Sequence, residues 1–191
     1  MKRIALALVT TLVTFASLSA QDSQWLRMWE NAQKLKPARV GSSERIAPAG
    51  QAGIPFVVRG TVLDPAGRPA ARVEVFAYQT DTHGIYAVPG APDPWPLKGW
   101  AVTDAEGRFE FRTIRPAAYP SNTIPGHVHL TFKGACCGRQ VTEVMFDDDP
   151  LATKEYRERQ AAGVIFGKVT KRADGSQETS YTFTLKPRGD F

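Results

Sequence analysis

The sequence predicts an all-β fold, a single β-sandwich of about eight strands with a short N-terminal helix and one surface helix. Short runs rich in β-branched and aromatic residues recur after residue 55, and turn sequences such as Asp64-Pro65-Ala66-Gly67 separate them. The length points the same way, because about 170 residues remain after an expected signal peptide, which is the size of one domain.

Residues 1–20 have the pattern of a secretory signal peptide. Lys2 and Arg3 precede an apolar run from Ile4 to Phe15, and small residues follow up to Ala20. The apolar run is too short for a membrane span. We therefore expect an exported protein, secreted or periplasmic, without a membrane partner.

Residues 21–55 are expected to form a helix and a linker. Trp25, Leu26, Met28 and Trp29 have helical spacing within residues 22–36, and Pro37 ends that pattern. The stretch from there to residue 55 is rich in Gly, Ser, Ala and Pro, which predicts an extended segment.

Residues 56–191 are expected to form the sandwich. Its strands are predicted at residues 56–63, 72–79, 99–103, 108–113, 127–133, 140–146, 164–171 and 179–186. The turn Ala173-Asp174-Gly175 joins the last two as a hairpin. The polar stretch 150–162 predicts the surface helix. The loop 84–99 is long and carries aromatic residues, which is typical of an ordered, functional loop.

The charge pattern argues against a nucleic-acid partner. The net charge is +5 for the whole chain and +3 once residues 1–20, which hold two basic residues and no acid, are removed. Those basic residues are scattered rather than clustered, so they offer no surface suited to a phosphate backbone. No motif specifies an oligomeric state.

Cys136 and Cys137 are the only cysteines and are adjacent in the sequence. In an oxidising compartment two cysteines usually form one disulfide, which here would be a vicinal ring. Free thiols, an intermolecular bridge and soft metal ligands remain alternatives.

His127 and His129 form the pair that organises the candidate site. In a strand, side chains at i and i+2 leave the same face, so both imidazoles would point at one spot, with Cα atoms about 6–7 Å apart. Imidazole is the commonest metal-binding side chain. A polar strand face that carries two imidazoles by chance is the competing interpretation.

Three elements in order decide between these interpretations. Gly84-Ile85-Tyr86 follows one predicted strand, Thr113-Ile114-Arg115-Pro116-Ala117-Ala118-Tyr119 follows another, and Gly126-His127-Val128-His129 opens a third. In this order they resemble the intradiol ring-cleavage dioxygenases, the family of catechol and protocatechuate 3,4-dioxygenases. The resemblance covers about residues 54–150.

The resemblance implies a non-haem ferric ion, Fe3+, held by Tyr86, Tyr119, His127 and His129. Phenolate is a hard anionic donor, and a trivalent ion can hold a tyrosine deprotonated. The implied reaction opens a catechol-type ring between its two hydroxylated carbons with O2. Tyr119 is the implied catalytic residue, a tyrosinate that substrate displaces and that then takes a catechol proton.

The chain departs from the family pattern at two positions. Ile124 stands where an arginine is usual, and Glu143 stands where a neutral amide is usual. Together with Trp100 these residues are candidates for the substrate pocket. Arg112, Arg115 or Arg139 are candidates to supply the missing positive charge from another position.

A second function class is compatible with part of the pattern. Gly-x-Val-x-Asp and Thr-Asp-x-x-Gly-x-Phe elements also occur in transthyretin-like and carboxypeptidase-regulatory-like binding modules. Such a module has no use for His127 and His129 after the second tyrosine. An iron-binding protein with altered catalysis, because of Ile124 and Glu143, is the intermediate possibility.

Overall fold

The computed structural model of the 191-residue chain describes residues 16–87, 91–160 and 164–187. The chain divides into two compact units, residues 1–35 and 36–191. The first contains helix α1 (Ala16–Gln33), in which the Trp25 and Trp29 rings stack with centroids 6.4 Å apart. The helix begins six residues earlier than predicted. Most of the predicted signal peptide, residues 1–15, lies outside the described residues.

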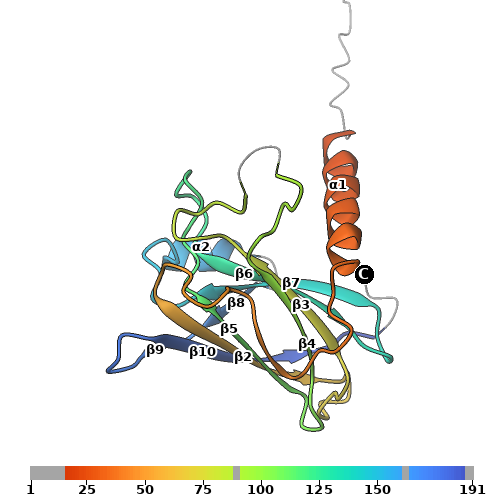
Figure 1. The fold of residues 1–191 in the computed structure, drawn as a ribbon. Coiled ribbons are helices and arrows are strands. Elements are labelled where there is room, and N and C mark those ends of the chain that lie inside the picture. The colour runs from red at the N-terminus through yellow and green to blue at the C-terminus, as the bar shows by residue number, and fades with distance from the viewer. Residues whose placement is uncertain (1–15, 88–90, 161–163, 188–191) are drawn as a thin grey trace, which may run out of the picture. The chain divides into compact units, whose positions relative to one another are not determined.

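The second unit is a sandwich of two five-stranded mixed sheets, which confirms the predicted all-β class (Figure 1). The first sheet contains, in spatial order, β1 (Ser43–Arg45), β5 (Arg108–Ile114), β2 (Pro55–Leu63), β10 (Gln177–Thr184) and β9 (Val169–Lys171). The second contains β4 (Lys98–Val102), β3 (Glu74–Gln79), β6 (His127–Lys133), β7 (Arg139–Phe146) and β8 (Val164–Gly167). The described residues thus form ten strands rather than about eight.

The two additional strands have separate causes. Strand β1 lies inside the predicted linker and pairs in parallel with β5, so the sandwich begins before residue 56. The stretch 164–171, predicted as one strand, is divided between the two sheets. Its first half, β8, pairs with β7 and its second half, β9, pairs with β10. Asp147 holds the crossing, because its backbone N–H donates to Gly167 and its carboxylate accepts from the Val169 N–H.

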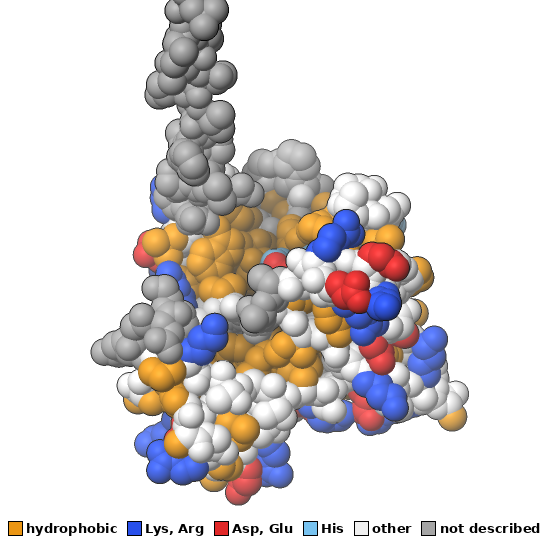
Figure 2. All heavy atoms as spheres, turned by 180° about the vertical axis from the view of Figure 1, so that it is seen from behind, with side chains coloured by type: hydrophobic (Ala, Val, Ile, Leu, Met, Phe, Trp, Pro, Cys, Tyr) orange, Lys and Arg blue, Asp and Glu red, His pale blue; other side chains and the backbone are white. Residues whose placement is uncertain are grey.

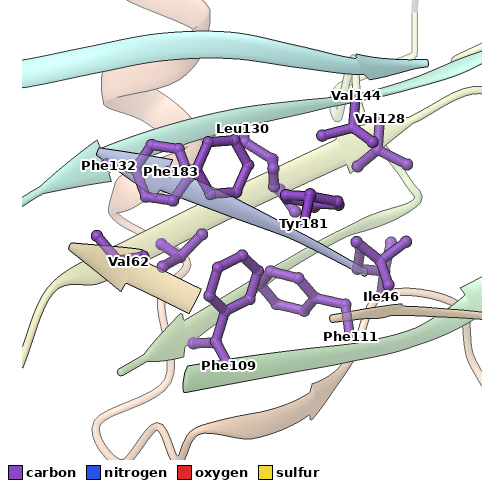
Figure 3. Close-up of a cluster of buried hydrophobic side chains, with 14 of the residues drawn as sticks. Ile46, Val62, Phe109, Phe111, Val128, Leu130, Phe132, Val144, Tyr181 and Phe183 are labelled. Carbon is purple, nitrogen blue, oxygen red and sulfur yellow. The ribbon is translucent and has the colours of Figure 1, made fainter. Parts of the chain in front are cut away.

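The hydrophobic core lies between the two sheets (Figure 3). Phe109 and Phe111 from β5 and Phe183 from β10 meet Leu130 and Phe132 from β6, and all five side chains are buried. Each such side chain contributes about 1.5–3 kcal/mol by leaving water. This core fixes the register of both sheets, since a slip by one residue would turn it toward solvent.

The outer face of the second sheet is also covered. Along β3, Val75 and Ala77 face the core, whereas Phe76 and Tyr78 face outward and are nevertheless buried. Two loops rise on this outer side (Figure 1), one described at residues 80–87 and 91–97 and the other at residues 115–126. The strand register places His127, His129 and Glu143 on the same face. The candidate site therefore lies on the outside of the sheet, beneath loops, and not in the sandwich core.

Hydrophobic side chains gather into a broad patch on the face shown in Figure 2, and basic and acidic side chains are interspersed around it. Helix α2 (Lys154–Arg159) lies within the predicted surface helix, and the Thr153 side chain caps it by accepting from the Tyr156 N–H. None of the described helices has the length and hydrophobicity that a membrane span requires.

Cys136 and Cys137 form a disulfide with each other, so the vicinal ring is the alternative that the structure adopts. The pair lies in the turn between β6 and β7. This turn follows Lys133, whereas His127 begins β6, so the disulfide lies at the opposite end of the strand from the histidines.

Candidate metal centre

Two loops bring the candidate tyrosines together, because they are hydrogen-bonded to each other where they leave the sheets. The Thr80 hydroxyl donates to the Ala117 carbonyl at 2.8 Å, and the Ala117 N–H donates to the Asp81 carbonyl at 3.1 Å. Asp81 also turns its own loop, since its carboxylate accepts from the backbone N–H groups of His83 and Ile85. The chain is thereby fixed immediately before Tyr86.

Gly84 allows the close approach of the two loops. Its φ is +75°, and a Cβ at this position would lie 1.9 Å from the Ala118 carbonyl oxygen. Any larger residue would both strain the backbone and push the loops apart. The glycine of the Gly-x-Tyr element therefore has a steric role, which is to let Tyr86 and Tyr119 approach each other.

Gln79 anchors both loops from below. It is fully buried at the end of β3, and its amide donates to the carbonyls of Thr80 and Ile114 and accepts from the Thr113 hydroxyl. Both polar atoms of the buried amide therefore have hydrogen-bond partners, so the amide stabilises the fold. It ties the start of the Tyr86 loop to the start of the Tyr119 loop.

The histidines enter the site from the beginning of β6. Gly126 precedes them in a crowded position, where its N–H donates to Asp149 at 2.9 Å and a Cβ would lie 2.6 Å from the Pro116 carbonyl oxygen. His127 and His129 then project from the same strand face, as the i, i+2 spacing predicts.

The four predicted ligands converge. The hydroxyl oxygens of Tyr86 and Tyr119 lie 2.6 Å apart, and the Nε2 atoms of His127 and His129 lie 3.0 Å apart. Between the two pairs, Tyr86 is 2.8 Å from His129 Nε2, and Tyr119 is 3.1 Å from His127 Nε2 and 3.4 Å from His129 Nε2. Two oxygens and two nitrogens thus surround one point.

The backbone determines the tautomer of His127. Its Nδ1 lies 2.7 Å from the Pro125 carbonyl oxygen, which can only accept, so Nδ1 carries the proton. Nε2 consequently presents a lone pair to the other three donors. On His129 the Glu143 carboxylate lies 3.4 Å from Nδ1 and favours the same tautomer. The two Nε2 atoms lie 3.0 Å apart, so a single metal ion could accept both lone pairs.

Burial favours the neutral forms of Tyr86, Tyr119 and His129 when no metal ion is bound. Burial raises the pKa of Tyr86 far above its usual value, and the hydrogen bond with Tyr119 raises it further. Burial also raises the pKa of Tyr119, and its hydrogen bond with Tyr86 offsets part of that effect. Burial lowers the pKa of His129 well below its usual value, and nearby His127 adds to the effect. Neutral imidazoles with free lone pairs are the metal-binding form.

This donor set fits ferric iron. Hard phenolate oxygens and imidazole nitrogens are both established ligands of trivalent iron, and the protein supplies two of each. The ion's charge would reverse the pKa balance at the tyrosines, because a nearby cation favours phenolate. The arrangement is pre-formed by the loop contacts and leaves the positions beyond the four donors to other molecules.

His127, His129 and Glu143 are a second possible ligand set, since one ligand atom from each lies within 4.8 Å of the others. The carboxylate, however, faces Nδ1 of His129, on the opposite side of the ring from the converging Nε2 atom. We therefore assign Glu143 to the surroundings of the centre rather than to its ligands.

Tyr78 is a site residue that the sequence did not predict. It stands directly opposite His129 in the β3–β6 pairing, and the two rings stack at 4.5 Å with planes 10° apart. Trp95, from the loop above, stacks on the other side at 4.0 Å. One signal in the sequence could have revealed this layer. Phe76 takes an outward position in the strand alternation, where a polar residue is usual, so this face of the strand had to be covered. This stack fixes the plane of the His129 ring.

The candidate pocket residues differ in their relation to the centre. Glu143 is paired directly with His129 in the β6–β7 register. Trp100 is buried against Phe76, with ring centroids 5.2 Å apart, and Phe76 and Tyr78 are its neighbours toward His129. Trp100 thus belongs to the aromatic layer beneath the loop. Ile124 is half-buried in the same loop as Tyr119.

The three candidate arginines all lie elsewhere. Arg115 forms a bidentate pair with Asp148 and donates to Gln177, beside a cavity at the end of the sandwich. Arg112 is exposed on the first sheet and donates to Ser43. Arg139 lies opposite Lys133 in the β6–β7 strand pairing, at the end of the hairpin farthest from His127. None of the three arginines supplies, at the centre, the positive charge of the arginine that is usual at position 124.

A sequence model described as "Dioxygenase" matches residues 38–189. The chain belongs to the intradiol ring-cleavage dioxygenase family. Family relatives include the protocatechuate 3,4-dioxygenase beta chain of Burkholderia cepacia, 37% identical over 108 residues, covering 50% of this chain and 46% of that protein. Catechol 1,2-dioxygenase 1 of Acinetobacter lwoffii is 29% identical over 130 residues, covering 58% and 42%. The chain thus spans about half the length of the curated relatives it matches.

Solved structures of the family share the fold. The dioxygenase domain of a dioxygenase–carbohydrate-binding fusion from Streptomyces sp. SirexAA-E has a TM-score of 0.62 at 23% identity, covering 79% of this chain and 92% of that one. Catechol 1,2-dioxygenase from Pseudomonas arvilla C-1 has a TM-score of 0.63 at 19% identity, covering 89% and 69%. At these identities the likeness shows the fold alone.

Proposed function

We propose that this protein is an exported ferric intradiol dioxygenase that opens a catechol-type ring between its two hydroxylated carbons with O2. Tyr86, Tyr119, His127 and His129 would hold the iron. The observation that carries the proposal is the convergence of these four donor atoms, all linked by distances of 2.6–3.4 Å. A transthyretin-like binding module would have no use for such a cluster.

The chemistry that bound iron supplies is chelation of the two catechol oxygens and withdrawal of electron density from the ring, which opens it to O2. A catechol that binds through both oxygens must lose its hydroxyl protons, so the site needs bases within reach. The protein offers its tyrosines as such bases.

Tyr119 is the tyrosine that is freer to act as the base. The Tyr86 ring packs 5.7 Å from the buried Tyr78 ring, and its hydroxyl lies 2.8 Å from His129 Nε2. The Tyr119 hydroxyl lies farther from the histidines, 3.1 Å from His127 Nε2 and 3.4 Å from His129 Nε2. Tyr119 would take the proton while Tyr86 and both histidines keep their places.

The aromatic layer beneath the site keeps water away from the centre. Tyr78, Trp95 and Phe76 are all buried, and Tyr78 covers one face of His129. Where water is excluded from one side of a site, the interactions between its charged groups are stronger.

Export is supported by the residue pattern of positions 1–20, and N-terminal sequencing of protein recovered from outside the cytoplasm would test it.

Purified protein loaded with ferric iron tests the proposal. Tyrosinate bound to ferric iron absorbs visible light, so we expect a coloured protein with one iron per chain and oxygen uptake in the presence of a catechol. The ring-opened diacid should accumulate in a one-to-one ratio with O2 consumed. An iron-loaded protein without visible absorption would refute the ligand assignment. A coloured protein that consumes no O2 with a range of catechols would refute the enzymatic activity.

A further inference from the structure

The charged side chains around the candidate centre are not all neutralised by partners, and this affects which substrates can bind. A row of four residues crosses the second sheet at the height of the site: Lys98 on β4, Tyr78 on β3, His129 on β6 and Glu143 on β7. Adjacent positions in such a row lie about 5 Å apart. Its two ends carry opposite charges, but only one of them is neutralised by a side chain of opposite charge.

Lys98 is compensated. It pairs with Asp93 and donates to the Trp95 carbonyl, and its side chain is 9% exposed. Lys98 is also separated from His129 by Tyr78. Its charge is therefore held within the loop that covers the aromatic layer, where the Asp93 carboxylate offsets it.

Glu143 is not compensated by a Lys or Arg. Its carboxylate lies 3.4 Å from His129 Nδ1, and across the described ranges no Lys or Arg nitrogen lies within ion-pairing distance of it. Its side chain is 35% exposed, against 13% for His129, so the carboxylate stands between the imidazole and solvent. The negative charge of Glu143 acts on both Tyr86 and Tyr119.

The three candidate arginines do not change this balance, since Arg115, Arg112 and Arg139 are all held elsewhere. Ile124 brings no charge to the Tyr119 loop. A trivalent ion bound by two phenolates would keep about one positive charge, which the Glu143 carboxylate offsets. The centre then has no surplus positive charge for an additional anion.

We infer that the site selects catechols whose ring substituents are neutral and discriminates against catechols that carry a carboxylate, with Glu143 as the specificity-determining residue. This inference rests on the proposed function. A ring carboxylate would enter the same partly desolvated site as the Glu143 carboxylate, where like charges repel with little screening. Neutral substituents, such as hydrogen or methyl, meet no such barrier.

Anaerobic titration of the iron-loaded full-length protein tests the inference without requiring turnover. Catechol, 4-methylcatechol and 3,4-dihydroxybenzoate are added separately, and the change in the visible tyrosinate absorption gives a dissociation constant for each. We expect 3,4-dihydroxybenzoate to bind at least about ten-fold more weakly than the two neutral catechols. Equal affinities in the native protein would overturn the inference.

Glu143→Gln assigns the effect to its residue. The amide keeps the size and shape of the side chain, so we expect the affinity ratio between neutral and carboxylated catechols to narrow to within about three-fold. Glu106→Gln is the matched control, because Glu106 is an exposed turn residue paired with Arg108, and the same loss of charge there should leave the ratio unchanged. An unchanged ratio in Glu143→Gln, or an equal narrowing in Glu106→Gln, would contradict the assignment.

Failure of the inference can be told apart from failure of the proposed function. Binding without oxygen uptake by any catechol would remove the enzymatic proposal, but the ratio of dissociation constants would still decide the selectivity. Oxygen uptake with equal affinity for all three compounds would support the enzyme and reject the selectivity.

Discussion

The hydroxyl oxygens of Tyr86 and Tyr119 lie 2.6 Å apart, although 33 positions separate the two residues in the sequence. Neither tyrosine is in a strand, so the sheets do not set this distance. It depends on Gln79, Thr80 and Gly84, which join the two loops just before each tyrosine. The ligands and the residues that bring them together are therefore different sets of side chains.

Removing the Tyr119 hydroxyl should separate iron binding from catalysis. Tyr119→Phe keeps three donors and one phenolate, so the protein should retain iron with a shifted visible band. Turnover should fall by about 100-fold or more, because the base is lost. Visible spectra, iron content and oxygen uptake on the same preparation check this. An unchanged spectrum would show that Tyr119 is not a ligand.

Removing His129 should abolish the centre. His129→Ala deletes the imidazole whose Nε2 lies within hydrogen-bonding distance of both tyrosines and His127, so iron and the visible band should both be lost. His83→Ala is the control, because His83 is 79% exposed on the turn before Tyr86 and should leave iron content unchanged. Equal iron content in the two variants would contradict the assignment.

Gly84→Ala should destabilise the protein by more than its backbone conformation alone explains. Gly84 and Gly175 have similar φ values of +75° and +82°, but a Cβ on Gly175 meets nothing within 4 Å. Alanine should cost about 1 kcal/mol at Gly175 through left-handed strain. At Gly84 it should cost roughly 1–3 kcal/mol more because of the overlap with Ala118.

Denaturant unfolding of the two variants measures this difference directly. The Gly84 variant should also bind iron more weakly, because its tyrosines are pushed apart. Equal destabilisation of both variants would mean that the loops can separate without cost and that Gly84 does not set the distance between Tyr86 and Tyr119.

Iron uptake should depend steeply on pH. Burial raises the pKa of both tyrosines above the usual value near 10, so at neutral pH each must lose a proton when it binds iron. The pKa of His129 is lowered, so at neutral pH it has no proton to release. The apparent affinity should therefore rise by about 100-fold per pH unit around and above pH 7, as expected for two released protons. Titration against a competing chelator at several pH values measures the slope, and a slope of zero would exclude tyrosinate ligands.

The local chemistry of the site was readable from the sequence because it depends on short spacings. The i, i+2 arrangement puts His127 and His129 on one face of any strand, and the alternation along β6 confirms that face. Turn residues and β-rich runs likewise located most of the strands. The stretch 164–171 was misjudged, because a run of strand-forming residues does not reveal that Asp147 divides it between two sheets.

By itself, then, the sequence predicted the β-sandwich class, the four candidate ligands and the unusual residues at positions 124 and 143. Side-chain period put the two histidines on one face, whereas the tyrosines and the two unusual positions came from the resemblance to the family. Only the tertiary structure decided that Tyr78 stacks on His129, that Glu143 faces Nδ1 of the same ring, and that no arginine replaces the one missing at Ile124. Strand register and loop packing set these contacts, and both depend on residues far apart in the chain.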